Sequence, residues 1–396
     1  MSVRDDAPDE AGYGSALRSL WRRDIRDRMR GDSARANARW GFLTPPRGDA
    51  KLVWVHTAAD YASTRIGVEL VRALRDKRQD IRIALTFERD QPELLAKLAG
   101  LTKVGYGFGP CDRPRAVARV LKRFEPLGIL HVGQAPRPRL SAAAHARRIR
   151  TVAVNAPPRG DSRVEVCYPR TENEAAQWRT ANAANEIAAP ASLLTLVVEA
   201  QVDPNFRAVV TGGADLSLRW LHGVAPAEYD EVLTRWRALT EHVPGILFIG
   251  PAQPAALAPL CARKNLPCVG LAQWPRSALA AGSVVAVDDA RWLPAIAASA
   301  QTIHLQTADA SVFWQALASG AAVSFARTEI VDAHLGRTPQ ARIVADYATL
   351  FAQWAQATHE PLALRKQGDE LRRSFWHERR RAATAVAELL QRVYDW

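Results

Sequence analysis

The stretch KLVWVHTAADYASTRIGVELVRALRDKRQDIRIALTF (51–87) decides the fold. It opens with KLVWVH (51–56), a continuous apolar run that is typical of a strand buried on both faces. Apolar residues then recur at helical spacing along one face: Ile66, Leu70, Ala73 and Leu74. The run IRIALTF (81–87) is the second expected strand. A strand, a helix and a strand in this order predict a parallel β-α-β unit.

The same alternation continues through the first half of the chain. We expect strands over 103–108, 128–132 and 151–155, and helices over 115–124 and 142–148. Right-handed crossovers would make this half a Rossmann-like domain. Residues 156–192 are rich in Pro, Ala, Asn and charge, which predicts an inter-domain connection with one short helix.

The alternation then restarts. We expect FRAVVTGG (206–213) to be a strand that enters a Gly-Gly turn. Further strands are predicted over 245–250, 267–271, 283–289, 302–307 and 321–326, and helices over 227–241, 254–264 and 311–319. The chain ends in a long Arg-rich helical stretch (363–394) with a break near Gly368. Its clustered arginines predict a solvated basic face: Arg372, Arg373, Arg379, Arg380 and Arg381.

These elements predict an α/β protein of two Rossmann-like domains whose parallel sheets face a central cleft, the GT-B architecture of glycosyltransferases. The expected parts are a basic N-terminal arm (1–48), an N-terminal domain (49–190), a C-terminal domain (191–360) and a helix that packs back across the cleft (361–396).

The composition limits the classes of binding partner and of site that we expect. The 396 residues are 48% hydrophobic, and 53 Lys and Arg against 41 Asp and Glu give a net charge of +12. A basic chain of this kind favours an anionic partner, such as a nucleotide, a lipid head group or a nucleic acid. The 4 cysteines have no C-x-x-C spacing and the 9 histidines are scattered, so we expect neither a metal site nor a disulfide framework.

Several classes are excluded by what the sequence lacks. There is no transmembrane run and no signal peptide, so we expect a cytoplasmic protein. No P-loop, dinucleotide fingerprint or G-x-S-x-G motif occurs in a strand–helix context. Arginine is spread over the whole chain rather than interleaved with aromatics on one element, which argues against a nucleic-acid binder.

The N-terminal helix has two readings. Residues 16–30 (ALRSLWRRDIRDRMR) place apolar side chains along one side of a helix: Leu17, Leu20, Trp21 and Ile25. Arginines surround them: Arg18, Arg22, Arg23 and Arg26. Such a helix can lie on anionic lipid, at the inner face of the cytoplasmic membrane. Because aspartates interrupt the positive charge, the sequence favours the alternative of a surface helix docked on the first domain.

The segment LVWVHTAADYASTRIGVELVRAL (52–74) resembles the opening of the 3-deoxy-manno-octulosonate (Kdo) transferases, in which a strand ending W-V-H precedes A-V-S-V-G-E and a helix. WGFLTPP (40–46) and TVAVNAPP (151–158) are similar to further family segments, and 283–326 to the donor-binding end. The resemblance implies transfer of Kdo or a related ulosonic acid from a nucleotide-activated, CMP-linked donor. The acceptor would be a glycan or a lipid-linked molecule of cell-envelope polysaccharide, including lipopolysaccharide. No other cofactor is implied.

The chain departs from the family where the chemistry lies. The family's catalytic glutamate closes S-V-G-E, whereas HTAADYAS (56–63) is one residue longer and has Asp60 as its sole carboxylate. The family's E-x-E-L-W-P becomes GQAPRPRL (133–140), without its acids, and P-R-H-P-E-R becomes GPAQPAA (250–256). A second function therefore stays open: a non-catalytic GT-B relative that acts as a binding or scaffold protein.

The candidate catalytic and acceptor residues follow the first domain's strands. Asp60 is a general base or else a helix N-cap. His56 orients an acceptor or is a satisfied strand-end histidine. Arg65 meets an anionic acceptor or is a solvated charge, and Gln134 and Arg137, in the altered acidic motif, are further acceptor candidates.

The candidate donor residues lie in the second domain. Gly212 and Gly213 would let backbone N–H groups approach a phosphate, or form an ordinary turn, and Arg219 would neutralise the phosphate.

The second donor candidate is the expected strand–helix junction at 302–319: Gln306, Thr307, Asp309, Ser311 and Gln315. Asp309 or Ser311 would cap the helix, whose N-terminus suits a phosphate. Gln315 stands where the family has a ribose-binding glutamate; the alternative is a plain cap with an exposed glutamine.

Overall fold

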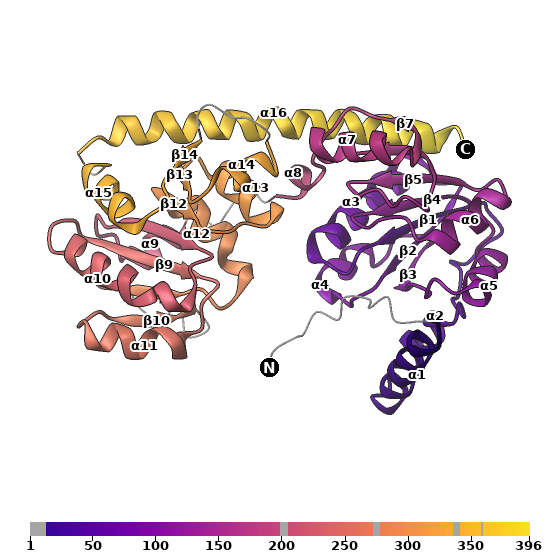
Figure 1. Cartoon of the computed structure of the whole chain (residues 1–396), viewed down its shortest axis with the longest axis horizontal. Coiled ribbons are helices and arrows are strands. Elements are labelled where there is room, and N and C mark those ends of the chain that lie inside the picture. The colour runs from indigo at the N-terminus through magenta and orange to yellow at the C-terminus, as the bar shows by residue number, and fades with distance from the viewer. Residues whose placement is uncertain (1–12, 199–204, 272–277, 336–340, 358) are drawn as a thin grey trace. The chain divides into compact units, whose positions relative to one another are not determined.

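The computed structural model describes residues 13–198, 205–271, 278–335, 341–357 and 359–396. The chain divides into two compact units (Figure 1). The N-terminal unit contains the described residues up to Pro169, with Ala176–Ala189 and Glu388–Trp396, and the C-terminal unit contains Arg170–Ala175 and the described residues of Pro190–Ala387.

A parallel sheet, seven-stranded over the described residues, forms the centre of the N-terminal unit. Its order is β3–β2–β1–β4–β5–β6–β7, so the direction of strand addition reverses between β1 and β4. Every residue of β1 (Leu52–Thr57) is buried, which explains its unbroken apolar run. The other strands are β2 (Arg82–Phe87), β3 (Val104–Phe108), β4 (Pro126–Val132), β5 (Arg150–Val154), β6 (Val164–Tyr168) and β7 (Ala184–Ile187).

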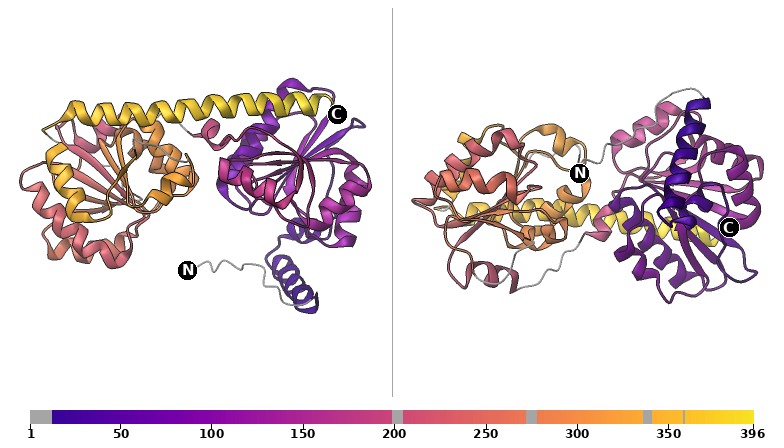
Figure 2. Two further views of the ribbon diagram at one scale, coloured as in Figure 1. Left: turned by 45° about the horizontal axis from the view of Figure 1, so that its top comes forward. Right: turned by 90° about the horizontal axis from the view of Figure 1, so that it is seen from below.

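Helices cover both faces of this sheet (Figures 1 and 2). In α3 (Tyr61–Lys77) the periodic residues Ile66, Leu70 and Leu74 are buried, as the sequence predicted. The others are α1 (Tyr13–Met29), α2 (Ser33–Arg39), α4 (Pro92–Leu95), the 3₁₀ turn η1 (Ala96–Leu98), α5 (Pro114–Phe124), α6 (Pro138–Ala146) and α7 (Glu172–Ala181).

The expected connection over 156–192 is wrong. This stretch contains β6, α7 and β7, and its two strands extend the first sheet. Trp178 of α7 explains why: its side chain is fully buried, and its Nε1 donates to the carbonyl of Ala156 at 2.9 Å. Cys167 and Trp178 belong to a small apolar core of their own, which a polar average composition conceals.

The C-terminal unit repeats the arrangement. Its parallel sheet, seven-stranded over the described residues, has the order β10–β11–β9–β8–β12–β13–β14, with a reversal between β8 and β12. The expected α/β class with two Rossmann-like sheets is confirmed. The strands are β8 (Ser217–His222), β9 (Gly245–Gly250), β10 (Cys268–Gly270), β11 (Val284–Ala286), β12 (Thr302–Leu305), β13 (Ala322–Phe325) and β14 (Arg342–Ile343).

Aromatic side chains anchor the helices of this unit. Trp236 is fully buried, and its Nε1 donates to the carbonyl of Gly282 at 3.0 Å. The helices are α8 (Leu194–Val197), α9 (Asn205–Thr211), α10 (Tyr229–Thr240), α11 (Pro254–Arg263), α12 (Leu293–Ser299), α13 (Ala310–Ser319), α14 (Thr328–Asp332) and α15 (Tyr347–Ala357), with 3₁₀ turns η2 (Pro226–Glu228) and η4 (Ala290–Trp292).

The expected strand over 206–213 is also wrong, because these residues form α9 and the turn after it. Phe206 and Val210, four residues apart, are buried, whereas Val209 is 44% exposed. This burial follows a helical period, which a short apolar run does not reveal by itself. The first strand of the second sheet is β8.

The last helix, α16 (Pro361–Tyr394), runs for 34 residues without the expected break near Gly368. A Cβ on Gly368 would lie 2.0 Å from the carbonyl oxygen of Gly320, so the glycine permits close packing on the end of α13. The end of the helix belongs to the N-terminal unit, where Arg392 donates to Glu186 of β7 at 2.6 Å. Among the described residues, no helix is both long enough and apolar enough to cross a bilayer.

Candidate functional site

Two histidines lie at the carboxyl end of the first sheet, where its strand order reverses. His56 of β1 and His131 of β4 are paired in register, and their ring centroids are 6.4 Å apart. Both side chains are fully buried. Ligands of doubly wound sheets bind outside the strand ends at such a reversal, so these rings lie beneath the expected ligand position.

Burial keeps both imidazoles neutral. It lowers the pKa of His131 to about 3, with a further contribution from the charge of Arg137. It also lowers the pKa of His56 far below its usual value, aided by Arg137 and His131. His56 Nδ1 lies 2.8 Å from Thr86 Oγ1, which accepts a hydrogen bond from Trp54 Nε1. One ring nitrogen of His56 is thus satisfied, whereas its buried Nε2 has no hydrogen-bond partner among the described residues.

Asp60 is the N-cap of α3. Its Oδ1 accepts a hydrogen bond from the backbone N–H of Ser63 at 2.8 Å, and the residue is exposed. A Cβ on Gly133 would lie 1.7 Å from Ser63 Oγ, so the loop after β4 packs directly on the first turn of α3. The structure therefore brings Asp60 and the segment after β4 to the same edge.

Arg137 is paired with an acid that the sequence interpretation did not single out. Its guanidinium contacts the carboxylate of Glu88, directly after β2, and also the carbonyl of Pro110. Gln134 Nε2 is buried with no hydrogen-bond partner among the described residues, and Arg65 is half-buried in the first turns of α3. Glu88 could have been predicted from the sequence, because it directly follows an expected parallel strand, and ligands bind at that end of the strands.

A cavity of about 420 Å³ lies in the same unit, between α2, the segment after it, and strands β2 and β3. Thr86, which contacts His56, lines it, as does Asp90. Gly107 also lines it, and a Cβ there would meet nothing within 4 Å. Small residues on the sheet thus leave this space open.

The second sheet has a corresponding edge, at the ends of β8 and β12. Gly223 follows β8 with φ +79°, and a Cβ on it would lie 2.1 Å from Thr307 Oγ1. Of the two residues expected to cap α13, Asp309 does so, accepting from the backbone N–H of Val312 at 2.9 Å. Gln306 hydrogen-bonds Tyr347, whose hydroxyl donates to Glu228 at 3.0 Å. Ser311 lies in the first turn of α13.

Gln315 is buried, with 8% of its surface exposed, so the alternative of an exposed glutamine is wrong. It lies in α13 with buried neighbours on both sides.

Two histidines that the sequence interpretation did not single out complete this edge. Burial lowers the pKa of His222 to about 4, against the opposing charge of Asp309, and its Nδ1 has no hydrogen-bond partner among the described residues. Burial and the charge of Arg170 lower the pKa of His334 to about 4, and its ring lies 4.5 Å from that of Phe313. A neutral imidazole can donate to a phosphate or accept from a sugar hydroxyl.

Three donor candidates are misplaced. Gly212 and Gly213 follow α9 and precede β8, so they lie at the amino end of the sheet and not at a strand–helix turn. Arg219 lies inside β8, 3% exposed, where its guanidinium donates to the carbonyl of Trp354 at 3.1 Å. It also lies 5.2 Å from the Trp354 ring, and burial lowers its pKa to about 10. The reason is that residues 205–211 form α9, so the Gly-Gly turn precedes the first strand of this sheet and does not follow it.

No group of three or more metal-ligating side chains occurs within the described residues.

Comparisons with known proteins agree with this architecture. Residues 34–187 match the family model described as 3-deoxy-D-manno-octulosonic-acid transferase (kdotransferase), covering most of the first sheet. A comparison with curated protein sequences gave no match.

Solved structures of low sequence identity share the fold. The UDP-GlcNAc 2-epimerase from Neisseria meningitidis bound to UDP-GlcNAc has a TM-score of 0.58 at 12% identity, covering 86% of this chain and 100% of that one. A ugt transferase from Siraitia grosvenorii in complex with UDP has 0.54 at 8%, covering 87% and 100%. MurG from Acinetobacter baumannii has 0.51 at 12%, covering 87% and 100%. The chain therefore has the fold of these proteins, and its residues 34–187 are similar to the Kdo transferases.

Proposed function

We propose that the protein is a glycosyltransferase that takes its sugar from a nucleotide-activated donor. The observation that carries the proposal is the match of residues 34–187 to the Kdo transferase model, on a chain whose second unit offers a separate strand-end site. Structures of the same fold are described with UDP or UDP-GlcNAc, which supports a nucleotide-sugar donor. The family relationship favours Kdo or a related ulosonic acid, carried by CMP, as the sugar.

The N-terminal unit would bind the acceptor, a glycan or a lipid-linked molecule of cell-envelope polysaccharide. Asp60 is our candidate base, because it is exposed at the end of β1, where transfer needs a group that accepts the acceptor's proton. Arg65, Gln134 and Arg137 are candidate acceptor contacts. The reaction would take place at the inner face of the cytoplasmic membrane, with peripheral contact through the N-terminal helix.

The C-terminal unit would bind the donor at the edge formed by β8, β12 and α13. The N-terminus of α13 and the backbone after Gly223 offer N–H groups to a phosphate. His222 Nδ1 is a buried polar atom at this edge that a ligand would satisfy. Gln315 would hydrogen-bond the ribose without the charge of a glutamate.

Calorimetry with CMP, UDP and GDP tests the donor site. We expect one nucleotide to bind best, and Gln315→Ala to weaken it by about tenfold, the usual worth of a hydrogen bond to a neutral group. Gln356→Ala, an exposed glutamine on α15, is the matched control and should bind like the wild type. Binding of all three nucleotides with equal strength in all variants, or of none, would contradict the proposal.

The second candidate is a non-catalytic GT-B relative that binds or scaffolds. Two observations favour it: the acids of the family's motifs are replaced in this sequence, and the two acids at the N-terminal edge already have partners. Asp60 caps α3, and Glu88 is paired with Arg137. Nucleotide binding does not separate the two candidates, whereas turnover does.

A further inference from the structure

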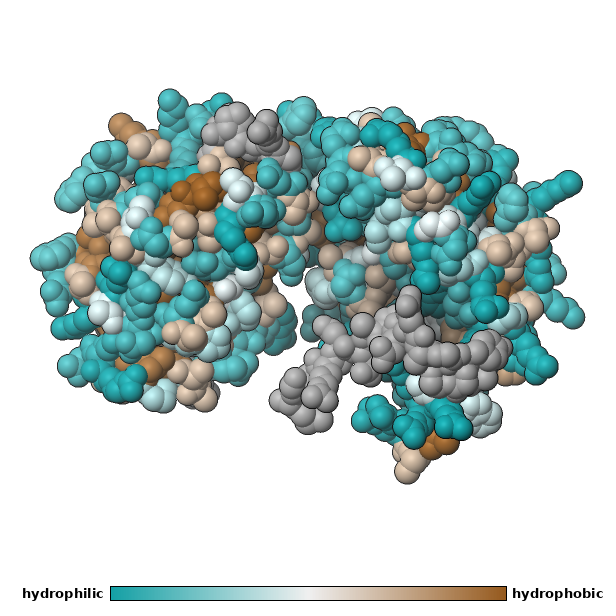
Figure 3. Space-filling view, in the orientation of Figure 1, coloured by the Kyte–Doolittle hydropathy of each residue, from teal (hydrophilic) through white to brown (hydrophobic). Residues whose placement is uncertain are grey.

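The outward side of α1 combines apolar and cationic residues. Trp21, Ile25 and Met29 are 58%, 51% and 84% exposed, and their spacing of four residues places them along one side of the helix. Arg18, Arg22 and Arg26 share that side and are exposed. We call these six residues the arm face. Figure 3 shows apolar surface on α1 bordered by hydrophilic surface.

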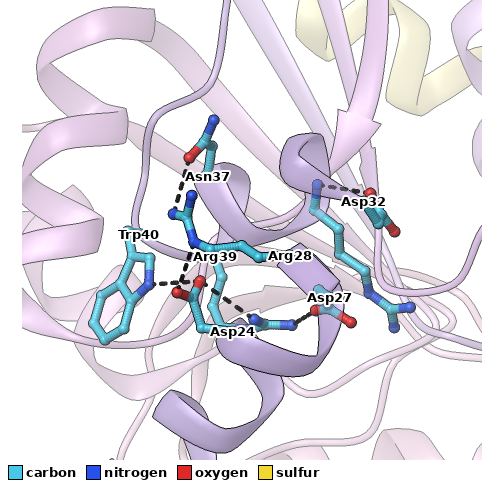
Figure 4. A network of polar contacts seen from close by, with 8 residues as sticks. Asp24, Asp27, Arg28, Asp32, Asn37, Arg39 and Trp40 are labelled. Carbon is cyan, nitrogen blue, oxygen red and sulfur yellow. Dashed lines mark hydrogen bonds and ion pairs between the residues drawn. The ribbon is translucent and has the colours of Figure 1, made fainter. Parts of the chain in front are cut away.

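The acids of α1 point the other way, into the domain. Asp24 and Asp27 are 6% and 8% exposed. Asp24 accepts from Trp40 Nε1 and from Arg28 Nε, each at 3.0 Å, and Asp27 is paired with Arg39 (Figure 4). Two buried carboxylates thus attach the polar side of the helix to the C-terminal end of α2, at Arg39 and Trp40.

That segment is itself fixed to the body of the unit. The carbonyl of Arg39 accepts from the backbone N–H of Cys111, and that of Trp40 from Arg119, both at 2.9 Å. Gly41 has φ +81°, and a Cβ on it would lie 2.3 Å from the carbonyl oxygen of Ala116 in α5. The orientation of α1 is therefore set by contacts that reach the core helix α5.

The aspartates of this region do not lie on the arm face, so they do not oppose its contact with an anionic lipid surface. Asp24 and Asp27, the two aspartates within residues 16–30, are turned inward. Asp32, just beyond that stretch, caps α2 and accepts from the backbone N–H of Arg35 at 3.1 Å. The arm face itself carries three positive charges and no acid. The expected docking of the helix on the first domain is confirmed. The helix docks by its acidic side, which leaves Trp21, Ile25 and Met29 exposed.

We propose that the arm face is a preformed docking surface for an anionic lipid bilayer. Trp21, Ile25 and Met29 would enter the boundary between head groups and acyl chains, and the arginines would contact anionic head groups. A second copy of the chain fits poorly, since two such faces would oppose like charges. The inference deepens the membrane contact within the proposed function, and it does not depend on the transfer reaction.

Co-sedimentation of the full chain with lipid vesicles tests the inference. One set of vesicles contains phosphatidylcholine alone, and the other contains phosphatidylcholine and phosphatidylglycerol at 7:3. We expect binding to the mixture only, weakened by at least tenfold when Trp21→Ser, Ile25→Ser and Met29→Ser are combined. These side chains are exposed, so the fold is kept. Leu362→Ser, 77% exposed on α16, is the matched control and should bind like the wild type.

A second variant set tests the charges. Combining Arg18→Gln, Arg22→Gln and Arg26→Gln should weaken binding by about 100-fold, at roughly fivefold for each arginine. The control combines Arg365→Gln, Arg373→Gln and Arg380→Gln, at three exposed arginines of α16, and should bind like the wild type. Equal binding by all variants, equal binding to both vesicles, or no binding by the wild type would overturn the inference. So would self-association lost in the serine variant. Transfer to a water-soluble acceptor should be unchanged in both arm-face variants, so a failed transfer assay leaves this test intact.

Discussion

At the scale of the residue, the N-terminal edge depends on how its two acids are held. Asp60 is exposed and uses one oxygen to cap α3, whereas Glu88 is held by Arg137. A carboxylate in an ion pair is a poorer proton acceptor than an exposed one, because protonation would break the pair. Asp60 is therefore the stronger candidate for a base.

The variant Asp60→Asn separates capping from catalysis. Asparagine caps helices about as well as aspartate, so the thermal midpoint should stay the same. Transfer should fall by about 10²–10⁴-fold, the usual contribution of a positioned base, with donor affinity unchanged. Glu88→Gln is the comparison and should retain more activity. Steady-state rates on both variants provide the measurement, and a fully active Asp60→Asn enzyme would exclude this residue from the mechanism.

The buried histidines predict how stability depends on pH. The pKa of His131 is about 3 in the folded protein and about 6.5 when unfolded, so below pH 6.5 the unfolded chain binds the proton more readily. Stability is complete above about pH 6.5 and is lost as the pH falls, by up to about 1.4 kcal/mol per unit for one such group. His131→Leu should therefore lose less stability between pH 7 and 5 than the wild type. His145→Leu, at an exposed histidine, should lose as much as the wild type in denaturant titrations. Equal pH dependence in all three proteins would contradict the assignment.

The sequence predicts those site residues whose contacts are local in the chain. The caps Asp60 and Asp309 follow from a side-chain oxygen three residues before a helical N–H, which is a local pattern. The burial of His131 beside His56 depends on the pairing of β1 with β4, which are more than 60 residues apart in the sequence. The position of Arg219 inside β8 could not be predicted, because the short apolar run before it fits a strand as well as the helix α9.

At the scale of the element, α16 shows how one glycine allows close packing. Gly368 lies against the backbone of Gly320 at the end of α13, where no side chain fits. Its helix nevertheless continues, because the loss in helix propensity is only about 1 kcal/mol and tertiary contacts exceed it.

Gly368→Ala should lower the free energy of unfolding of the C-terminal unit by about 1–3 kcal/mol, because the added methyl group overpacks a backbone contact. Asp369→Ala, at the exposed neighbouring position, should change it by less than about 0.5 kcal/mol. Chemical denaturation compares the two, and equal stabilities would show that the helix does not need this approach.

The attachment of α1 makes a separate prediction. Arg39→Leu removes the partner of a buried carboxylate, Asp27, so α1 should open more easily. Amide hydrogen exchange over residues 21–29 should become about tenfold faster, equivalent to about 1.4 kcal/mol, with β1 unchanged. Arg26→Gln, on the arm face, should exchange like the wild type. Unchanged exchange in Arg39→Leu would mean that other contacts hold the helix.

Most strands and helices could be predicted because buried parallel strands are apolar runs separated by periodic helices. The exceptions have physical causes. The strand β7 (ANEI) is half-exposed at the sheet edge and carries no apolar run. The run in α9 is short enough to fit either a strand or one buried side of a helix.

At the scale of the whole molecule, both units repeat one topology. Each sheet adds strands in one direction and then reverses, and each reversal holds buried neutral histidines beside a helix that an aspartate caps. The match to the Kdo transferase model covers residues 34–187, and the chain as a whole shares its fold with the solved structures. The proposed transferase activity rests on these two strand-end edges, one in each unit.

Release of free nucleotide from a panel of CMP-, UDP- and GDP-linked sugars, in the presence of cell-envelope acceptor extracts, tests this account most directly. We expect the wild type to release one nucleotide faster when acceptor is present, and Gln315→Ala, but not Gln356→Ala, to reduce this rate. If a nucleotide sugar binds but no sugar of the panel gives acceptor-dependent release of nucleotide, the proposal of an enzyme is contradicted. The protein would then be a non-catalytic binding protein.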